Sequence, residues 1–257
     1  MAAPAPAWSK PTMSDERKTL ILTGASRGIG HATVKRFAAA GWRVITCSRM
    51  AFSEDCPWEA GPEDHVQIDL SDLENIDHGV ATMLERLDGA PLNALVNNAA
   101  ISPKGPSGER LNTLTTNLRQ WRDVFHVNFY GPVVLARGLI EALQAGHGSI
   151  VNVTSIAGSR VHPFAGTAYS TSKAALASLT REMAGDFGAF GVRVNAISPG
   201  EIETAMIGPE YQALAEEIPM ARLGRPEEVA SLVYYLCSEQ ASYINGAEIH
   251  VNGGQHV

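Results

Sequence analysis

The chain alternates short, continuously apolar runs with longer segments of helical periodicity. The runs LVNN, IVNVTS and VRVNAIS are apolar until their last residues, which are polar. This pattern is typical of parallel strands covered on both faces, because their side chains meet a polar environment only at the carboxyl edge of the sheet. It predicts βαβ units around one parallel sheet, with the chemistry at that edge.

Seven such runs are expected to form the strands of one doubly wound sheet. Helical stretches such as residues 31–40 and 73–87 lie between them, so helices should cover both faces. We therefore expect a single-domain α/β fold of the Rossmann type over residues 18–257, and a disordered Ala/Pro-rich tail over residues 1–17. The predicted strands are residues 19–23, 43–47, 65–69, 94–97, 149–154, 193–197 and 248–251.

Composition argues against several classes of protein. The formal charge of -7, without a long Lys/Arg run, gives no basic surface for nucleic acid. No apolar run approaches the roughly 18 residues that cross a bilayer, and the start lacks a secretory signal. Cys47, Cys56 and Cys237 lack the spacing of a disulfide framework or a zinc site. We expect a cytoplasmic protein with no metal, no nucleic-acid partner and no membrane association.

A glycine-rich turn follows the first predicted strand and opens a helix. Its sequence is Gly24-Ala-Ser-Arg-Gly28-Ile-Gly30, with the spacing GxxxGxG. Glycines allow a tight turn and close approach of the backbone, while the N–H groups and dipole at the helix start attract an anion. The turn therefore predicts a site for the pyrophosphate of a dinucleotide. The alternative is an ordinary connection between a strand and a helix.

Tyr169 and Lys173 are four residues apart in a predicted helix, so they lie on one face. An isolated phenol has a pKa near ~10, and a nearby cation lowers that pKa towards neutrality, where proton exchange is efficient. Ser155, at the end of the preceding strand, could hold a substrate oxygen. The alternative for the pair is a surface Tyr/Lys contact on an amphipathic helix.

Taken together, these motifs resemble the short-chain dehydrogenase/reductase family over about residue 18 to the end of the chain. One departure is Ala100, where the family usually has the second glycine of NNAG; the extra methyl group should alter local packing more than chemistry. The resemblance rests on TGASRGIG, NNAA at 97–100, Ser155, Tyr169-x-x-x-Lys173, Pro199-Gly200 and INGAEIHVNGG.

The resemblance implies roles for four catalytic residues. Ser155 and Tyr169 would hydrogen-bond the reacting oxygen, and Lys173 would also bind the nicotinamide ribose. Asn128, within HVNFYG, would stabilise a helix kink and a water through which Lys173 exchanges protons. Asn128 could equally be a buried amide with its hydrogen bonds satisfied. The family also implies a homo-oligomer, with a tetramer expected from interfaces on the helices that precede Asn128 and carry Tyr169.

Cofactor preference is expected at the end of the second strand, where an acidic residue would select NAD by binding the ribose hydroxyls. Here the chain has Ser48 and Arg49, and Arg27 lies in the glycine turn. Two guanidinium groups around a 2′-phosphate favour NADP(H) over NAD(H). The alternative is that both arginines are solvated surface charges.

The resemblance extends the predicted cofactor site along the carboxyl edge. Asp69, with Leu70 beside it, would bind the adenine amino group, Asn97 would contact a ribose, and the segment after Pro199 would wrap the nicotinamide amide. The full predicted set is Gly24, Ser26, Arg27, Gly28, Ile29, Gly30, Ser48, Arg49, Asp69, Leu70, Asn97, Ala99, Tyr169, Lys173, Pro199, Gly200, Ile202 and Thr204.

The sequence thus predicts an NADP(H)-dependent oxidoreductase that transfers a hydride between the nicotinamide and a carbonyl or secondary alcohol, acting as a carbonyl reductase. The alternatives are an NAD-dependent alcohol dehydrogenase of the same family, a non-catalytic dinucleotide-binding regulator and a purely structural interaction protein. Residues 101–113 and 200–224 are expected to shape the pocket for a small-molecule substrate. Their composition does not distinguish a sugar, a ketoacid ester, a steroid or a quinone.

Overall fold

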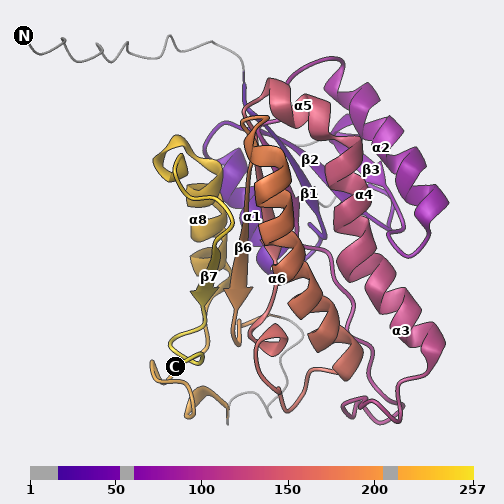
Figure 1. Cartoon of the computed structure of the whole chain (residues 1–257), viewed down its shortest axis with the longest axis vertical. Coiled ribbons are helices and arrows are strands. Elements are labelled where there is room, and N and C mark those ends of the chain that lie inside the picture. Colours follow the sequence, from indigo (N-terminus) through magenta and orange to yellow (C-terminus); the bar gives the residue numbers. More distant parts are fainter. Residues whose placement is uncertain (1–16, 53–60, 205–213) are drawn as a thin grey trace, which may run out of the picture.

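Seven parallel strands form one sheet at the centre of the molecule, as the sequence predicts (Figure 1). The computed structural model describes residues 17–52, 61–204 and 214–257. The order across the sheet is β3-β2-β1-β4-β5-β6-β7. The strands are β1 (Thr19–Thr23), β2 (Arg43–Ser48), β3 (His65–Gln67), β4 (Ala94–Asn97), β5 (Ser149–Val153), β6 (Arg193–Pro199) and β7 (Glu248–Val251).

Two strand ends differ from the prediction by two residues for local reasons, and the ends of β2 and β5 differ by one. β3 stops before Asp69, because the Asp69 backbone N–H donates to the side chain of Asn75 at 2.6 Å and its carboxylate accepts from the Ser71 N–H at 2.9 Å. These bonds turn the chain into the next helix. β6 continues to Pro199, because that residue lies opposite Val251 and the pairing with β7 extends to the carboxyl edge.

The strand order reverses direction between β1 and β4. From β1 the chain proceeds outward through β2 to β3, then returns to place β4 on the other side of β1. Connections leave the two strands in opposite directions, which opens a crevice at their carboxyl ends. The glycine turn after β1 and the NNAA motif after β4 both lie at this crevice.

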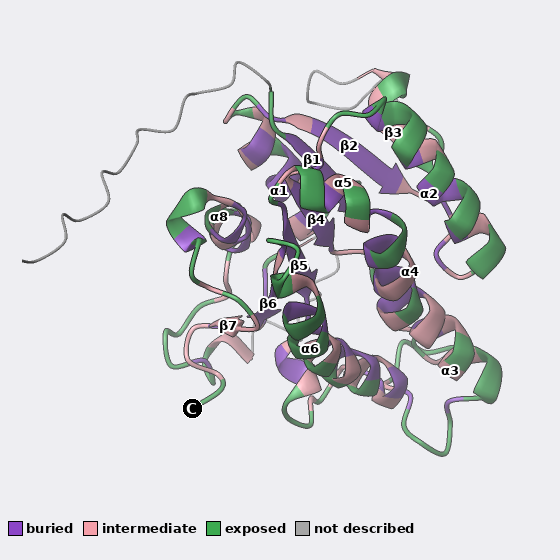
Figure 2. Cartoon of the chain, turned by 45° about the horizontal axis from the view of Figure 1, so that its top comes forward, coloured by how far each residue is buried: buried purple, intermediate pink, exposed green. Residues whose placement is uncertain are grey.

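Helices cover both faces of the sheet, as predicted. Alternate residues of β1 point to opposite faces: Leu20 and Leu22 pack in one core with Phe37, and Ile21 packs in the other with Met83. Figure 2 shows the buried strands between α8 on one side and α4 on the other. The first face is covered by α1 (Gly28–Ala38) and α8 (Pro226–Cys237), the second by α2 (Leu73–Leu87), α4 (Gly131–Gly138) and α6 (Thr167–Gly188).

Shorter helices complete the connections. The longest of them, α3 (Leu118–Phe125), begins with a capping box in which Asn117 and Gln120 bond to each other's backbone N–H groups. It continues directly into a π-helical turn. The others are η1 (Pro62–Asp64), η2 (His126–Tyr130, the π-helical turn), α5 (Ile140–Ala145), η3 (Ile156–Gly158) and η4 (Glu239–Ala241).

A chain of buried amides joins β4, β5 and α6. The Asn97 side chain donates to the Asn152 Oδ1 at 2.8 Å, and the Asn152 Nδ2 donates to the Thr180 hydroxyl at 2.9 Å. All three side chains are buried. Because a buried polar group without a partner is costly, these bonds fix the register of the helix over the two strands.

The expected N-terminal tail lies outside the described residues up to residue 16. Arg17 is described, and its guanidinium donates to the carbonyl oxygens of Gly41 at 3.0 Å and Trp42 at 3.1 Å. These two bonds hold Arg17 against the turn between α1 and β2.

Candidate functional site

The glycine turn after β1 is packed so closely that side chains cannot replace its glycines. A Cβ on Gly24, which has φ of 73°, would lie 2.8 Å from the Cα of Ala99. A Cβ on Gly30 would lie 2.0 Å from the carbonyl oxygen of Gly24. These distances are shorter than a van der Waals contact, so the turn requires glycine at both positions. The predicted close approach of backbone segments is therefore present at the crevice.

Asn98 ties this turn to the end of β4. Its Nδ2 donates to the carbonyl oxygens of Thr23 at 3.1 Å and Gly24 at 2.9 Å. In return, the Thr23 hydroxyl accepts from the backbone N–H groups of Asn98 and Ala99, both at 3.1 Å. Asn98 and Thr23 are not in the predicted site, although they belong to the motifs NNAA and TGASRGIG. They hold the two sides of the crevice together.

The start of α1 has the properties of an anion site. Arg27 occupies the N-cap position with no side-chain capping bond to the described residues, and the first turn contains no acidic side chain. Its backbone N–H groups and the positive end of the helix dipole therefore face the crevice without a competing anion from the turn itself. Ser26 and Arg27 are exposed, and Ile29 is half-buried. This arrangement fits the phosphates of a dinucleotide.

The predicted adenosine end of the site lies at the ends of β2 and β3. Arg49 is exposed, and the Ser48 hydroxyl donates to the carbonyl oxygen of Met50 at 3.0 Å. Asp69 has a lowered pKa, mainly because its carboxylate accepts from the Ser71 N–H and hydroxyl; Arg49 adds to the shift and partial burial opposes it. Asp69 therefore presents a carboxylate at neutral pH, beside the buried Leu70.

Lys173 and Tyr169 lie together on α6, as their spacing requires. The Lys173 Nζ lies 5.7 Å from the centre of the Tyr169 ring and donates to the Val153 carbonyl oxygen at 2.6 Å. The Lys173 side chain is only 2% exposed, and this burial lowers its pKa to about 7. Val153 ends β5, so the ammonium is held next to the strand end from which Ser155 follows. The Ser155 hydroxyl accepts from the Ala157 N–H at 3.2 Å, which leaves its proton for another acceptor.

Asn128 lies in the π-helical turn η2 and is fully buried. Its Oδ1 accepts from the Ile101 N–H at 2.9 Å, and its Nδ2 donates to the Ile101 carbonyl at 3.1 Å and the Ser172 hydroxyl at 3.0 Å. The Ser172 hydroxyl in turn donates to the Tyr169 carbonyl at 2.7 Å. The side chain thus supports α6 next to Tyr169. A π-helical turn is often found at functional sites.

The segment after β6 passes over the glycine turn. A Cβ placed on Gly28 would lie 3.0 Å from the methyl group of Thr204, so these two predicted cofactor residues face each other. Pro199 and Ile202 are buried, and Ile202 forms a parallel bridge with Gly224. A Cβ on Gly200 would lie 2.6 Å from that of Asn252. Residues 205–213 of the predicted substrate loop lie outside the described residues.

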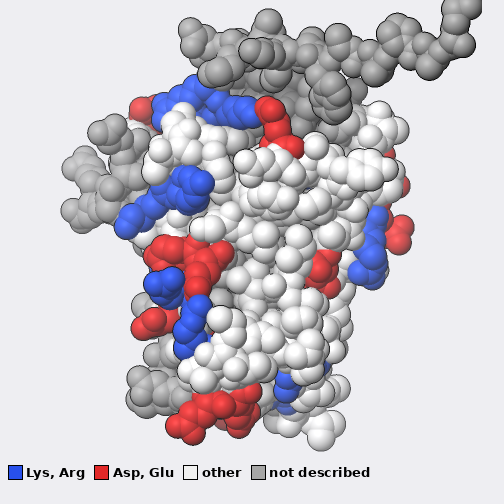
Figure 3. Space-filling model, turned by 90° about the vertical axis from the view of Figure 1, so that its left-hand side faces the viewer, with Lys and Arg blue, Asp and Glu red and all other residues white. Residues whose placement is uncertain are grey.

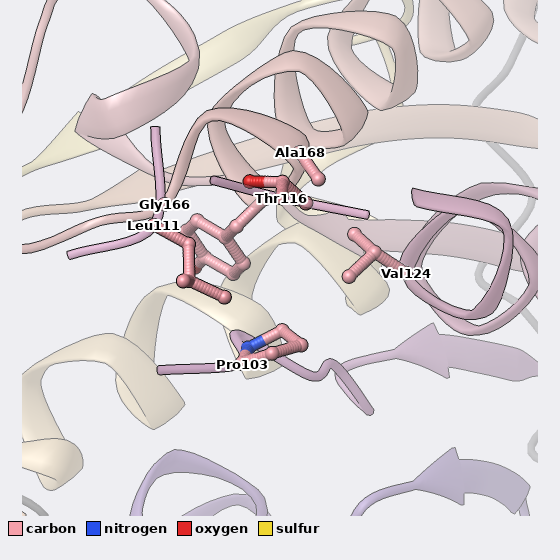
Figure 4. A pocket seen from close by; sticks show the side chains of 7 residues that line it. Pro103, Leu111, Thr116, Val124, Gly166 and Ala168 are labelled. Carbon is pink, nitrogen blue, oxygen red and sulfur yellow. The ribbon is translucent and has the colours of Figure 1, made fainter. Parts of the chain in front are cut away.

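The loop after β4 approaches Tyr169 from the other side. Pro103 and Leu111 belong to the predicted substrate loop 101–113, and with Val124 they converge on a small cavity that Tyr169 also lines (Figure 4). The cavity measures about 10 Å³, close to the minimum for one water molecule. Apolar side chains therefore shield one side of the tyrosine.

No helix in ranges 17–52, 61–204 and 214–257 is long and apolar enough to cross a membrane. Within the same ranges, no group of three His, Cys, Asp or Glu side chains is placed to hold a metal ion.

Comparison with known proteins agrees with this geometry. Residues 24–256 match the family model described as enoyl-(acyl carrier protein) reductase. The chain is 58% identical over 244 residues to Protein FixR of Bradyrhizobium diazoefficiens, covering 94% of this chain and 88% of that protein. It is 37% identical over 252 residues to the 3-oxoacyl-(acyl-carrier-protein) reductase FabG of Aquifex aeolicus, covering 92% and 96%.

A solved structure shows the same architecture. An oxidoreductase of the short-chain dehydrogenase/reductase family from Brucella ovis, in complex with a partially ordered NAD, superposes with a TM-score of 0.82 at 62% identity. The alignment covers 92% of this chain and all of that one. The chain therefore belongs to the short-chain dehydrogenase/reductase family and is an oxidoreductase.

Proposed function

We propose that this protein is an NADP(H)-dependent carbonyl reductase. The observation that carries the proposal is the buried ammonium of Lys173, held by the end of β5 and beside the ring of Tyr169, at the carboxyl edge where Ser155 follows. When bound along this edge, the cofactor's nicotinamide would supply or accept the hydride. The residues proposed to hold the cofactor are the set predicted from the sequence, from Gly24 to Thr204.

Ser155 and Tyr169 have different roles at the substrate oxygen. Ser155 donates a hydrogen bond that orients the carbonyl and polarises it. Tyr169 donates the proton that the oxygen requires as the carbonyl carbon is reduced. In the reverse reaction the same phenol oxygen takes the proton from an alcohol.

Lys173 makes proton loss from Tyr169 easier. Its ammonium favours negative charge that develops on the phenol oxygen as the proton leaves. Burial strengthens this attraction, because little solvent separates the two groups, but it also weakens proton binding at Lys173 itself. We propose that Asn128 supports the exchange of protons with solvent by holding the π-helical turn against α6.

The proposed cofactor preference rests on Arg49 and Arg27. Both are exposed at the crevice, and neither β2 nor the residue after it supplies the acidic side chain that selects NAD. The Brucella ovis relative was solved with NAD, so an NAD-dependent alcohol dehydrogenase is the competing function.

Reduction is the proposed direction because cells usually hold NADP(H) in the reduced form. A regulatory protein without activity would have no use for the set of Ser155, Tyr169 and Lys173.

We also propose a homotetramer in the cytoplasm. On α3 and η2, Trp121 stacks on Phe125 with ring centroids 6.2 Å apart, and Phe125 contacts Phe129. Leu118 of the same helix is 86% exposed, so this aromatic row offers an apolar face to a second copy. Much of the side that carries α8 and β7 has no charged side chain (Figure 3).

The cytoplasmic location is supported by the buried, unpaired thiols of Cys47 and Cys237.

Replacing Tyr169 with phenylalanine should remove the proton donor while leaving the cofactor site in place. We expect kcat to fall by about 10²- to 10⁴-fold, with NADPH still bound by the remaining residues of the predicted cofactor set. The measurement is loss of NADPH absorbance with a panel of sugars, ketoacid esters, steroids and quinones. Tyr243→Phe, at a fully exposed tyrosine, is the matched control. Wild-type turnover in Tyr169→Phe would refute the assigned role.

Replacing Arg49 with alanine should weaken NADPH binding selectively. Loss of a charge-assisted bond to the 2′-phosphate should raise the Kd for NADPH roughly tenfold or more, with little change in that for NADH. Fluorescence titration with NADPH and NADH measures the ratio of the two Kd values. Arg119→Ala, at an exposed residue of α3, is the control. Equal affinities of the wild-type protein for NADH and NADPH would overturn the proposed preference.

The buried Lys173 predicts a pH dependence of stability for the cofactor-free protein. The folded protein releases this proton near pH 7 and the unfolded chain near pH 10.5, so the unfolded chain binds more protons between those values. The destabilising effect of burial is therefore complete below pH 7 and is relieved as the pH rises. The free energy of unfolding of wild type, relative to Lys173→Met, should rise by up to about 1.4 kcal/mol per pH unit in that window.

Urea unfolding at a series of pH values measures this difference. Lys35→Met, at an exposed lysine of α1, should give no such slope relative to wild type. A constant difference between wild type and Lys173→Met from pH 7 to 10 would show that burial does not lower the Lys173 pKa.

A further inference from the structure

His162 and Glu201 meet between two loops at the carboxyl edge of the sheet. His162 belongs to the segment between η3 and α6, and Glu201 follows Pro199-Gly200 at the end of β6. The His162 Nε2 contacts the Glu201 Oε1, and their side chains are 11% and 8% exposed. Neither residue belongs to the predicted site. Desolvation of a carboxylate is costly unless it is hydrogen-bonded, so the buried Glu201 side chain needs a partner such as His162.

The proton position on His162 follows from its other contacts. Its Nδ1 accepts from the backbone N–H groups of Phe164 at 3.2 Å and Ala165 at 3.1 Å. Two donors pointing at one ring nitrogen require a lone pair there, so the ring proton is on Nε2 and is donated to the Glu201 carboxylate. A second proton on the ring would break both backbone bonds. His162 therefore uses both ring nitrogens, one toward Glu201 and one toward the backbone of Phe164 and Ala165.

The backbone of the same two residues is also held by the loop after β4. Lys104 Nζ donates to the Phe164 carbonyl oxygen, and Arg110 Nε donates to the Ala165 carbonyl oxygen at 2.7 Å. The N–H of Thr167, the first residue of α6, donates to the Leu111 carbonyl oxygen at 3.0 Å. The segment 162–167, which leads into Tyr169, is thus fixed between His162 and residues 104–111.

Glu201 is also fixed at its backbone. Its N–H donates to the Gln255 Oε1 at 3.2 Å, and its side chain lines a cavity of about 300 Å³ with Asn252 and His250. The loops after β4, β5 and β6 are therefore joined by one series of hydrogen bonds, with His162 at its centre. Two of these loops are proposed to shape the substrate pocket, and the third leads into the tyrosine.

We infer that His162 and Glu201 are positioning residues that couple the cofactor side of the site to the substrate side. Contact between the nicotinamide and the described start of this loop, residues 200–204, would restrain Glu201, and the His162–Glu201 contact would pass this restraint to the segment 162–167 beside the substrate. The inference rests on the proposed function, because it assumes that the dinucleotide contacts the loop after β6. It predicts that the cofactor-loaded protein binds substrate more tightly when the His162–Glu201 contact links the loops than when this contact is broken.

Hydrogen–deuterium exchange tests the coupling without any turnover. In the wild-type protein, the nicotinamide dinucleotide of higher affinity should slow exchange of the segment 162–167 roughly tenfold or more. Two replacements of His162 each keep one arm of the bridge. His162→Asn keeps an acceptor for the two backbone N–H groups and loses the donor to Glu201, whereas His162→Gln keeps that donor and loses the acceptor.

Both variants should bind the cofactor about as tightly as wild type, and both should lose most of the protection, because the bridge needs both arms. Asp64→Ala is the control, because it removes a partly buried ion pair with Arg43 at the opposite edge of the sheet. This variant should keep the cofactor-dependent protection of the segment 162–167. Cofactor protection that is absent in wild type, or is retained in either His162 variant, would overturn the inference. These outcomes do not depend on whether Tyr169 is the proton donor.

A second measurement separates positioning from a purely structural role. With a carbonyl substrate found for the wild-type protein, His162→Asn should raise KM roughly tenfold and change kcat less, because Tyr169 and Lys173 are unaltered. A structural role would lower the melting temperature and the active fraction while KM stays the same. That second result would also overturn the inference.

Discussion

The hydrogen bond from Lys173 to the Val153 carbonyl is the interaction on which the site depends. It places an ammonium group in the interior, where burial opposes its charge, and it connects α6 to the end of β5. A purely structural lysine would gain stability by reaching solvent. The proposed function gives this buried charge a role, because the Tyr169 ring lies next to the ammonium group. The same bond fixes the distance between the helix and the strand end that leads to Ser155.

The remainder of the edge surrounds this bond with segments that cannot move independently. Asn128 and Ser172 support the backbone at Tyr169 from the π-helical turn. Asn98 closes the glycine turn against the end of β4, which keeps the positive end of α1 facing the crevice. His162 and Glu201 link the loop after β5 to the loop after β6. Each of these polar groups has a backbone or side-chain partner, so the segments around the site are connected to one another.

Local pattern predicted much of this fold, because apolar strands and helical periodicity depend on residues that are close together in the sequence. The ends of β3 and β6 were less accurate, since they depend on the side chain of Asn75 and on pairing with β7. Helical spacing predicted that Tyr169 and Lys173 share a face, but no spacing predicts the bond to Val153. The contact of His162 with Glu201 joins loops far apart in the chain, and such pairings require the tertiary structure. The catalytic roles of Ser155, Tyr169, Lys173 and Asn128, and the roles of the cofactor residues, stay predictions.

A crystal structure of the protein with bound NADP(H) tests the central claim most directly. The distances to measure run from the Tyr169 hydroxyl to the Ser155 hydroxyl and to the reactive carbon of the nicotinamide. We predict that both hydroxyl groups face one small space in front of that carbon, with Lys173 between Tyr169 and the ribose. A Tyr169 hydroxyl that points into bulk solvent, remote from Ser155 and the nicotinamide, would contradict the account.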